Sequence, residues 1–269
     1  MRTVHIAASA PADPLNDALA VLLVAGDGAF VSHHTAARLY RGIVPDDARL
    51  HASTTGARHR SRIPGVFVHR STRTPTQYRG VPVTSPSDTF LDLVPTLGLL
   101  DLVTLGDSLV TRRLTTPRRL VAGASTLTKD RRKAERAASL VRVGVDSPME
   151  TRLRLLIVLA GLPEPEVNIE IHNEFGDIVR RIDLGYRAAK LGLEYDGRQH
   201  AESTQQYGSD VRRREDISAL DWHEWTAVSN DIFKTPADTL ARIVAVMTKR
   251  GMNVPPLKDD WRAHFPGRS

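Results

Sequence analysis

Three acidic residues in the second half of the chain have the types and spacing of a metal site. Asp183 ends one apolar, strand-like run, and eleven residues later Glu194 and Asp196 stand one residue apart on the next run. Alternate side chains of a β-strand point to opposite faces, so Glu194 and Asp196 are predicted to project together. Carboxylates that converge at one end of a hairpin repel one another, and a hard cation or a basic partner usually holds them. The pattern therefore predicts a site for Mg²⁺, or for Mn²⁺, that serves phosphodiester chemistry.

A histidine close to these acids would complete the chemistry. Mg²⁺ prefers oxygen ligands in an octahedron, and Asp183 with one of Glu194 or Asp196 would supply carboxylates. The bound metal would lower the pKa of a water molecule and stabilise negative charge on the scissile phosphate. His200 follows Asp196 by four residues. It is a candidate general base, or a candidate acid that protonates the leaving oxygen.

Glu150 is a further candidate at the start of a predicted helix. The segment Ser147-Pro148-Met149-Glu150 has a capping serine, a proline at the first helical position and a glutamate three residues after the cap. The same glutamate satisfies a capping box. A purely structural role and a role at the metal site are therefore both open.

Basic residues supply candidate contacts to a polyanionic substrate. Arg198 or Arg213 would neutralise the charge that builds on the phosphate. Between residues 118 and 142 the chain has eight basic residues and two acidic ones. Such a run is commonly a solvated helix face or a linker, but near a carboxylate cluster it favours a polyanionic partner, here DNA. The candidate substrate contacts are Arg131, Arg132, Arg181, Arg198 and Arg213.

Each of these candidates also has a structural explanation that stays open. The three acids would form a salt-bridged strand end if they paired with neighbouring arginines, which are Arg180, Arg181 and Arg198. Asp196-Gly197 is also a common hairpin-turn dipeptide, and His200 would then be an ordinary turn histidine. Asp210 and Arg213, three residues apart, would make an ion pair on a helix surface.

The composition of the chain excludes several classes of protein and of functional site. The chain has 269 residues, enough for one large domain or two ordinary ones. It has no cysteine, which excludes disulfides, zinc–thiolate sites and thiol catalysis and suits a cytoplasmic protein. No apolar run approaches the length of a membrane span, and the opening residues are too short and broken for a signal peptide. With 37 basic and 31 acidic residues, the chain is compatible with a nucleic-acid partner.

Hydrophobic periodicity and turn residues divide the chain into four parts. Residues 1–117 are predicted to form a smaller α+β domain, and residues 118–145 a basic connector. Residues 146–252 follow the order helix, strand, strand, strand, helix, strand, helix. Residues 253–269 contain three prolines and mixed charge, and are predicted to be a loose tail. The predicted fold class is α/β, of the α+β kind, with a mixed sheet in the larger domain.

The αβββαβ order, with Asp183 and Glu194 on successive strands, resembles the PD-(D/E)XK nuclease superfamily. Within it, residues 147–247 are similar to the very-short-patch-repair (Vsr) endonuclease-like domains. The matching residues are Glu150, Arg181-Ile182-Asp183-Leu184, Leu193-Glu194-Tyr195-Asp196-Gly197, His200, Asp210 and Arg213, ahead of Trp222. The resemblance implies a DNA endonuclease that depends on Mg²⁺ or Mn²⁺ and acts in repair, restriction or phage defence.

One position departs from the superfamily's pattern. The second acid is followed after one residue by a lysine that orients the attacking water, and Asp196 stands there instead. Vsr-like members also lack this lysine and have a histidine nearby, so His200 is expected to compensate. The departure keeps an alternative open, a non-catalytic DNA-binding or antitoxin-like regulator that retains the nuclease fold.

The first part carries a second resemblance. The segments Phe30–Ala37, Gly80–Pro86 and Thr89–Leu93 are similar to the region after the winged helix in AbiEi-type antitoxin relatives. Asp88 stands where those relatives usually have arginine, and the similarity does not include the winged helix, so promoter binding is not implied. The run Ser32-His33-His34 is expected to be a capped helix start with solvent-facing histidines. Besides DNA, a second copy of the chain or a toxin- or restriction-type protein remains a candidate partner.

Overall fold

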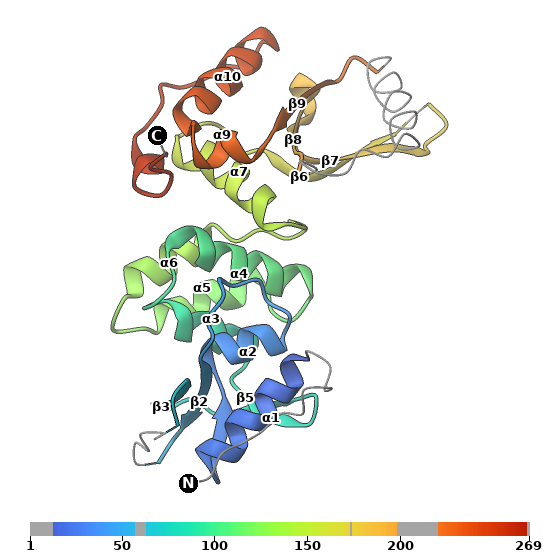
Figure 1. Cartoon of the computed structure of the whole chain (residues 1–269). Coiled ribbons are helices and arrows are strands. Elements are labelled where there is room, and N and C mark those ends of the chain that lie inside the picture. The colour runs from blue at the N-terminus through green and yellow to red at the C-terminus, as the bar shows by residue number, and fades with distance from the viewer. Residues whose placement is uncertain (1–12, 57–62, 173, 198–219, 268–269) are drawn as a thin grey trace. The chain divides into compact units, whose positions relative to one another are not determined.

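The structure is a computed structural model of the whole chain, and it describes residues 13–56, 63–172, 174–197 and 220–267. The chain folds into two compact units, Met1–Val143 and Gly144–Ser269, whose elements are drawn in Figure 1. Each unit combines helices with one mixed β-sheet. The predicted α+β class is therefore confirmed.

The first unit is built on a five-stranded sheet with the order β3-β2-β1-β5-β4. Its strands are β1 (Ala29–Val31), β2 (Leu50–Thr54), β3 (Val66–Arg70), β4 (Thr76–Tyr78) and β5 (Val81–Val83). β1 is antiparallel to β2 and parallel to β5, and β2 is parallel to β3. All residues of β1 are buried, because this short apolar run is the central strand of the sheet.

Helices cover this sheet and extend the core of the unit. They are α1 (Pro14–Ala25), α2 (His33–Leu39), α3 (Pro86–Leu93) and α4 (Leu99–Thr111). The side chains of Asp13 and Ser85 accept hydrogen bonds from backbone N–H groups in the first turns of α1 and α3, and a proline follows each cap. α1, drawn in blue in Figure 1, packs against β1 and β2. Most of α4 is buried, so this helix forms the centre of the helical layer.

The basic stretch 118–145 was predicted to be a connector, and the structure corrects this. α5 (Pro117–Ser125) packs against α3, and α6 (Arg131–Ser139) packs against α4 and α5. The buried residues of these two helices are Leu120, Ala124, Ala134, Ala137 and Ala138. The prediction was wrong because small alanines form the apolar face of α6, and the surrounding charges concealed that stripe.

The second unit has α7 (Pro148–Leu159) packed on a four-stranded sheet with the order β6-β7-β8-β9. The strands are β6 (Glu166–His172), β7 (Ile178–Tyr186), β8 (Leu191–Tyr195) and β9 (His223–Ala227), and the short 3-10 helix η1 (Arg187–Ala189) connects β7 to β8. β6 and β8 are antiparallel to β7, whereas β9 is parallel to β8. α9 (Ser229–Phe233) and α10 (Pro236–Lys249) follow β9 and pack on α7. The helix expected between the third and fourth strands of this part, at residues 209–220, lies almost wholly outside the described residues.

The C-terminal residues 253–269 were predicted to be loose, but those that the structure describes pack on the second unit. The 3-10 helix η2 (Asp260–Ala263) lies against α7. Trp261 and Phe265 are both buried. Two aromatic side chains therefore anchor a segment whose prolines suggested disorder.

A substitution at Gly106 in α4 tests whether Val141, which lies just beyond α6, belongs to the core of the first unit. A methyl group at Gly106 would overlap the Val141 side chain and would lie 3.2 Å from Phe90 Cε2. We expect Gly106→Ala to lower the free energy of unfolding by about 1–3 kcal/mol, although alanine normally stabilises a helix interior. In a protein that already carries Val141→Ala, the Gly106→Ala change should lower the free energy of unfolding by much less. Urea unfolding measures both differences, and a Gly106→Ala variant more stable than wild type would contradict this packing.

Candidate functional site

The β7–β8 hairpin brings two of the predicted acids to its end. Leu184 pairs with Leu193 across the two strands, and Asp183 and Glu194 stand directly beyond this pair. The backbone N–H of Tyr195 donates to Asp183 Oδ2 at 3.4 Å, which ties this carboxylate to the neighbouring strand. Asp183 and Glu194 therefore lie on adjacent strands, as predicted.

Glu194 is held by an arginine of the same hairpin. Arg180 Nη2 donates to both carboxylate oxygens of Glu194, at 2.8 and 2.7 Å. Arg180 Nε donates to Glu224 Oε1 at 3.0 Å, so one guanidinium joins an acid of β8 to an acid of β9. Glu194 was predicted either to bind a metal or to pair with a neighbouring arginine, and the structure contains the ion pair with Arg180.

Glu150 and Asp183 form an acidic group with Asp146. Glu150 is buried near the start of α7, and the Asp146 N–H donates to its Oε2 at 3.0 Å. The Glu150 N–H donates to Ser147 Oγ at 3.2 Å, so Ser147 caps the N-terminus of α7 as predicted. Burial raises the pKa of Glu150, and the charges of Asp183 and Asp146 raise it further. Burial also raises the pKa of Asp183, against the lowering effects of the Tyr195 N–H and the Arg180 charge, and the charge of Asp146 raises it further. Such mutual repulsion favours a bound cation or a bound proton.

The three acids that the sequence singled out do not meet at one point in this conformation. Within the described part of the chain, no set of ligand oxygens from Asp183, Glu194 and Asp196 lies within 4.8 Å of one another. The Asp196 N–H donates to the Ala227 carbonyl at 2.8 Å, which extends the pairing of β8 with β9. A cation bound by all three would require side chains to move, and their role as metal ligands stays a prediction.

The other predicted site residues pair with different acids, belong to the first unit or fall outside the described residues. Those outside the described residues are Arg198, His200, Asp210 and Arg213. Arg181 Nη2 donates to Glu170 Oε1 on β6 at 2.8 Å. Arg131 Nε donates to Glu135 Oε1 at 2.8 Å, and Arg131 and Arg132 are exposed on α6. Arg131 and Arg132 belong to the first unit, and their contact with a substrate remains a prediction.

A cluster of histidines in the first unit is the feature that the sequence did not predict. Ser32 and His34 are buried, which corrects the expected solvent-facing helix start. The ring of His33 stacks on that of His69 with centroids 3.8 Å apart, and His51 Nδ1 lies 2.9 Å from His69 Nε2. His51 and His69 come from the parallel strands β2 and β3. Their approach depends on strand pairing, which has no local signature in the sequence.

A cavity of about 300 Å³ lies beside this cluster. Its polar lining includes His33, Ser53, His69, Arg70, Arg73 and Asp92. Arg73 Nε donates to Asp92 Oδ1 at 2.6 Å, and its Nη1 pairs with Asp88. Burial raises the pKa of Asp92 to about 6, even though Arg73 acts in the opposite direction. The cavity therefore combines cationic side chains with an acid that titrates close to neutral pH.

Asp92→Asn tests the burial of this carboxylate. The pKa of Asp92 rises from 3.8 to about 6 on folding, so the folded protein binds this proton more tightly than the unfolded chain does. Ionisation of Asp92 must then lower the stability as the pH rises from about 4 to about 6. Relative to Asp92→Asn, wild type should lose about 2 kcal/mol of unfolding free energy over this interval.

Urea unfolding of both proteins across this pH range measures the difference. Nearby histidines titrate in wild type and variant alike, so their contributions largely cancel in the comparison. A difference between the two proteins that does not change with pH would contradict the raised pKa of Asp92.

Comparisons with known proteins complete the description of the chain. No protein-family model matches it, and no solved structure matches it. Two proteins of Mycobacterium tuberculosis are each 26% identical to it over 223 residues, which cover 81% of this chain and 81% of the relative. They are the uncharacterized protein MT2308 of strain CDC 1551 / Oshkosh and the uncharacterized protein Rv2248 of strain ATCC 25618 / H37Rv. In the part of the chain that the structure describes, no helix has both the length and the apolar character of a membrane span. The chain is thus similar, over most of its length, to proteins whose names state no activity.

Proposed function

We propose that this protein is a metal-dependent DNA endonuclease whose centre lies at the acids of the second unit. The observation that carries the proposal is the buried Glu150 carboxylate, whose pKa is raised by burial and by the charges of Asp183 and Asp146. A divalent cation would relieve this repulsion. Oxygen ligands alone suit Mg²⁺ or Mn²⁺ better than softer metals.

The two central carboxylates are oriented before any cation binds. The Tyr195 N–H fixes Asp183, and the Asp146 N–H fixes Glu150. A bound cation would supply a water of lowered pKa and would stabilise charge on the phosphate. Glu194 is held nearby by Arg180, and in this proposal a cation competes with that guanidinium for the carboxylate.

A basic surface on the first unit supports DNA as the substrate. The chain carries a formal net charge of +6, and both α5 and α6 place basic side chains in solvent while their apolar residues are buried. The exposed basic residues of this surface are Arg118, Arg119, Lys129, Arg131, Arg132 and Arg136. Contacts from such residues to phosphates supply affinity without sequence preference.

Nicking of supercoiled plasmid tests the enzyme. Wild type is expected to nick DNA with Mg²⁺ or Mn²⁺ and to stop when EDTA is added. Asp183→Asn and Glu150→Gln should each lower the rate at least about 100-fold, because each removes a charged ligand. Glu170→Gln changes an acid on β6 that pairs with Arg181, and this matched control should cut like wild type.

Circular dichroism of each variant checks that the second unit remains folded. The enzyme proposal fails if wild type and Asp183→Asn give the same background cleavage with both metals.

DNA binding without cleavage is a second function, and the Arg180 ion pairs favour it. The guanidinium of Arg180 neutralises Glu194 and Glu224 at once, which would let the acidic edge persist without a metal. Asp196 in place of the superfamily's lysine favours it as well. This alternative predicts DNA retention that EDTA does not change.

The salt dependence of DNA affinity tests the basic surface under either function. Fluorescence anisotropy of a labelled duplex at several salt concentrations gives the slope of log affinity against log salt. Replacing both Arg118 and Arg119 with serine should reduce the magnitude of this slope by about 2, because each phosphate contact contributes roughly 1. An unchanged slope would remove α5 from the DNA-binding surface.

A further inference from the structure

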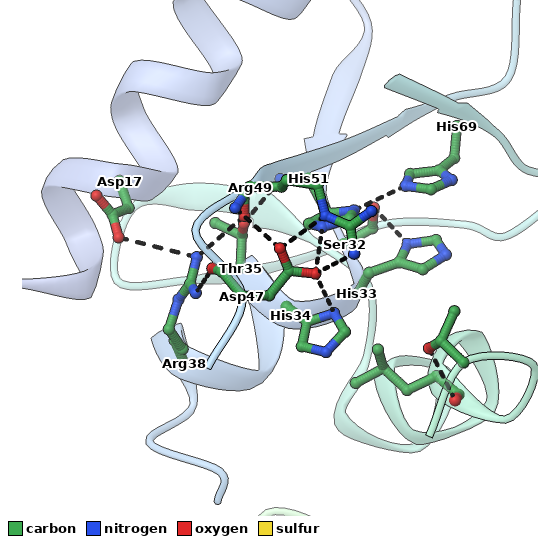
Figure 2. Close-up of polar contacts among 12 residues, drawn as sticks. Asp17, Ser32, His33, His34, Thr35, Arg38, Asp47, Arg49, His51 and His69 are labelled. Carbon is green, nitrogen blue, oxygen red and sulfur yellow. Dashed lines mark hydrogen bonds and ion pairs between the residues drawn. The ribbon is translucent and has the colours of Figure 1, made fainter. Parts of the chain in front are cut away.

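His34, Asp47 and His51 meet in the interior of the first unit. His34 lies at the start of α2, Asp47 in the segment before β2, and His51 within β2. Figure 2 shows the three side chains pointing toward one another. Their relative exposures are 8% for His34, 8% for Asp47 and 6% for His51, so each is more than nine-tenths buried. Two imidazoles and one carboxylate are a common set of metal ligands.

The ligand atoms are spaced nearly as a small cation requires. His34 Nδ1 lies 3.6 Å from Asp47 Oδ2, and His51 Nε2 lies 3.5 Å from the same oxygen. Among the described residues, this is the only group of three histidine or acidic side chains whose ligand atoms all lie within 4.8 Å of one another. A tetrahedral Zn²⁺ ion with bonds of about 2.0–2.1 Å separates its ligand atoms by about 3.3 Å. Small side-chain shifts would therefore bring these atoms to bonding distance of one ion.

Two ring nitrogens of this group have no hydrogen bond to satisfy them. His34 Nδ1 and His51 Nε2 are buried, and neither has a hydrogen-bond partner in the described part of the chain. Their separations from Asp47 Oδ2, 3.6 and 3.5 Å, exceed the range of a good N–H···O bond. Buried polar atoms are nearly always satisfied, so two such nitrogens facing one carboxylate oxygen indicate a site for an ion.

The neighbours of the group orient its members. His51 Nδ1 lies 2.9 Å from His69 Nε2, so a metal on the other ring nitrogen would make Nδ1 the donor to His69. A metal-bound histidine normally donates its other ring N–H to an acceptor, and His69 Nε2 stands in that position here. The His51 backbone N–H donates to Thr35 Oγ1 at 2.8 Å, which joins β2 to α2. Arg49 Nε and Nη2 donate to the two oxygens of Asp47, at 2.7 and 2.6 Å.

We propose that His34, Asp47 and His51 bind one Zn²⁺ ion or a similar transition metal. Two imidazoles with one carboxylate suit zinc, cobalt or nickel, whereas magnesium prefers oxygen ligands alone. The ion would tie the segment before β2 to α2 and β2, which is a structural role within the first unit. The site shares no residue with the proposed nuclease centre, so the two proposals can be tested separately.

Arg49 limits the affinity of this site. Its guanidinium is the resident positive partner of Asp47, and the side chain is half exposed. A second positive charge beside the carboxylate opposes a divalent cation. Removal of the Arg49 charge is therefore expected to strengthen metal binding, whereas removal of a ligand weakens it.

Calorimetric titration with zinc chloride tests the proposal on the full chain, purified without a histidine tag and stripped of metal with a chelator. Wild type is expected to bind one equivalent with high affinity. His34→Gln and His51→Gln should each weaken binding at least about 100-fold. His172→Gln replaces an exposed histidine of β6, and this matched control should bind like wild type. The proposal is overturned if wild type takes up no zinc, or if all four proteins bind it equally.

Two further measurements remain decisive if the ligand variants do not fold. Co²⁺ added to wild type should give the intense visible absorption of a four-coordinate site, and a weak six-coordinate spectrum would overturn the proposal. Arg49→Gln retains all three ligands and should bind zinc roughly tenfold more tightly than wild type. Weaker binding by Arg49→Gln would contradict the assigned geometry.

Discussion

Buried and half-buried carboxylates need a positive partner, and in this chain arginine supplies it repeatedly. The pairs are Arg180 with Glu194 and Glu224, Arg73 with Asp88 and Asp92, and Arg49 with Asp47. In two of these cases one guanidinium serves two acids, so it also fixes the strands or helix turns that carry them. Loss of such an arginine would leave charges that the protein interior solvates poorly.

Glu150 and Asp183 each accept a hydrogen bond from a backbone N–H group. A hydrogen bond from the backbone orients a carboxylate but carries no full charge, and the pKa of both groups stays above its ordinary value because burial dominates. The acids of the second unit therefore differ in kind. Glu194 forms an ion pair with Arg180, whereas the pKa values of Glu150 and Asp183 stay raised, that of Asp183 even with the Arg180 charge nearby. In our proposal a divalent cation would stabilise these two carboxylates. The histidine group of the first unit differs from these acids, because imidazole nitrogens bind softer ions than magnesium.

The sequence could predict those features that depend on local pattern. The capping serine before Glu150 and the strand-like runs that carry Asp183 and Glu194 are local, and both appear in the structure. The pairing of Arg180 with Glu194 depends on the alignment of the strands, so the sequence left it as one of two arrangements, and the bond from Arg180 to Glu224 was not predicted. The alternation rule placed acids on one face but could not say which of them a guanidinium would reach.

Long-range packing explains what the sequence did not predict. His34, Asp47 and His51 are close in the chain, yet their meeting depends on how the segment before β2 folds back on α2. The alanines of α6 were concealed by its charges, and the buried Trp261 by the prolines around it. In each case the decisive contact depends on tertiary packing, about which local periodicity carries no information.

Anomalous diffraction from a crystal soaked in Mn²⁺ would locate the cation in the second unit directly. The predicted result is a manganese peak in contact with the carboxylates of Glu150 and Asp183, with the Arg180–Glu194 pair loosened or opened. A crystal at millimolar Mn²⁺ with no peak at these carboxylates, and with Arg180 still bound to both oxygens of Glu194, would contradict a metal-dependent nuclease centre.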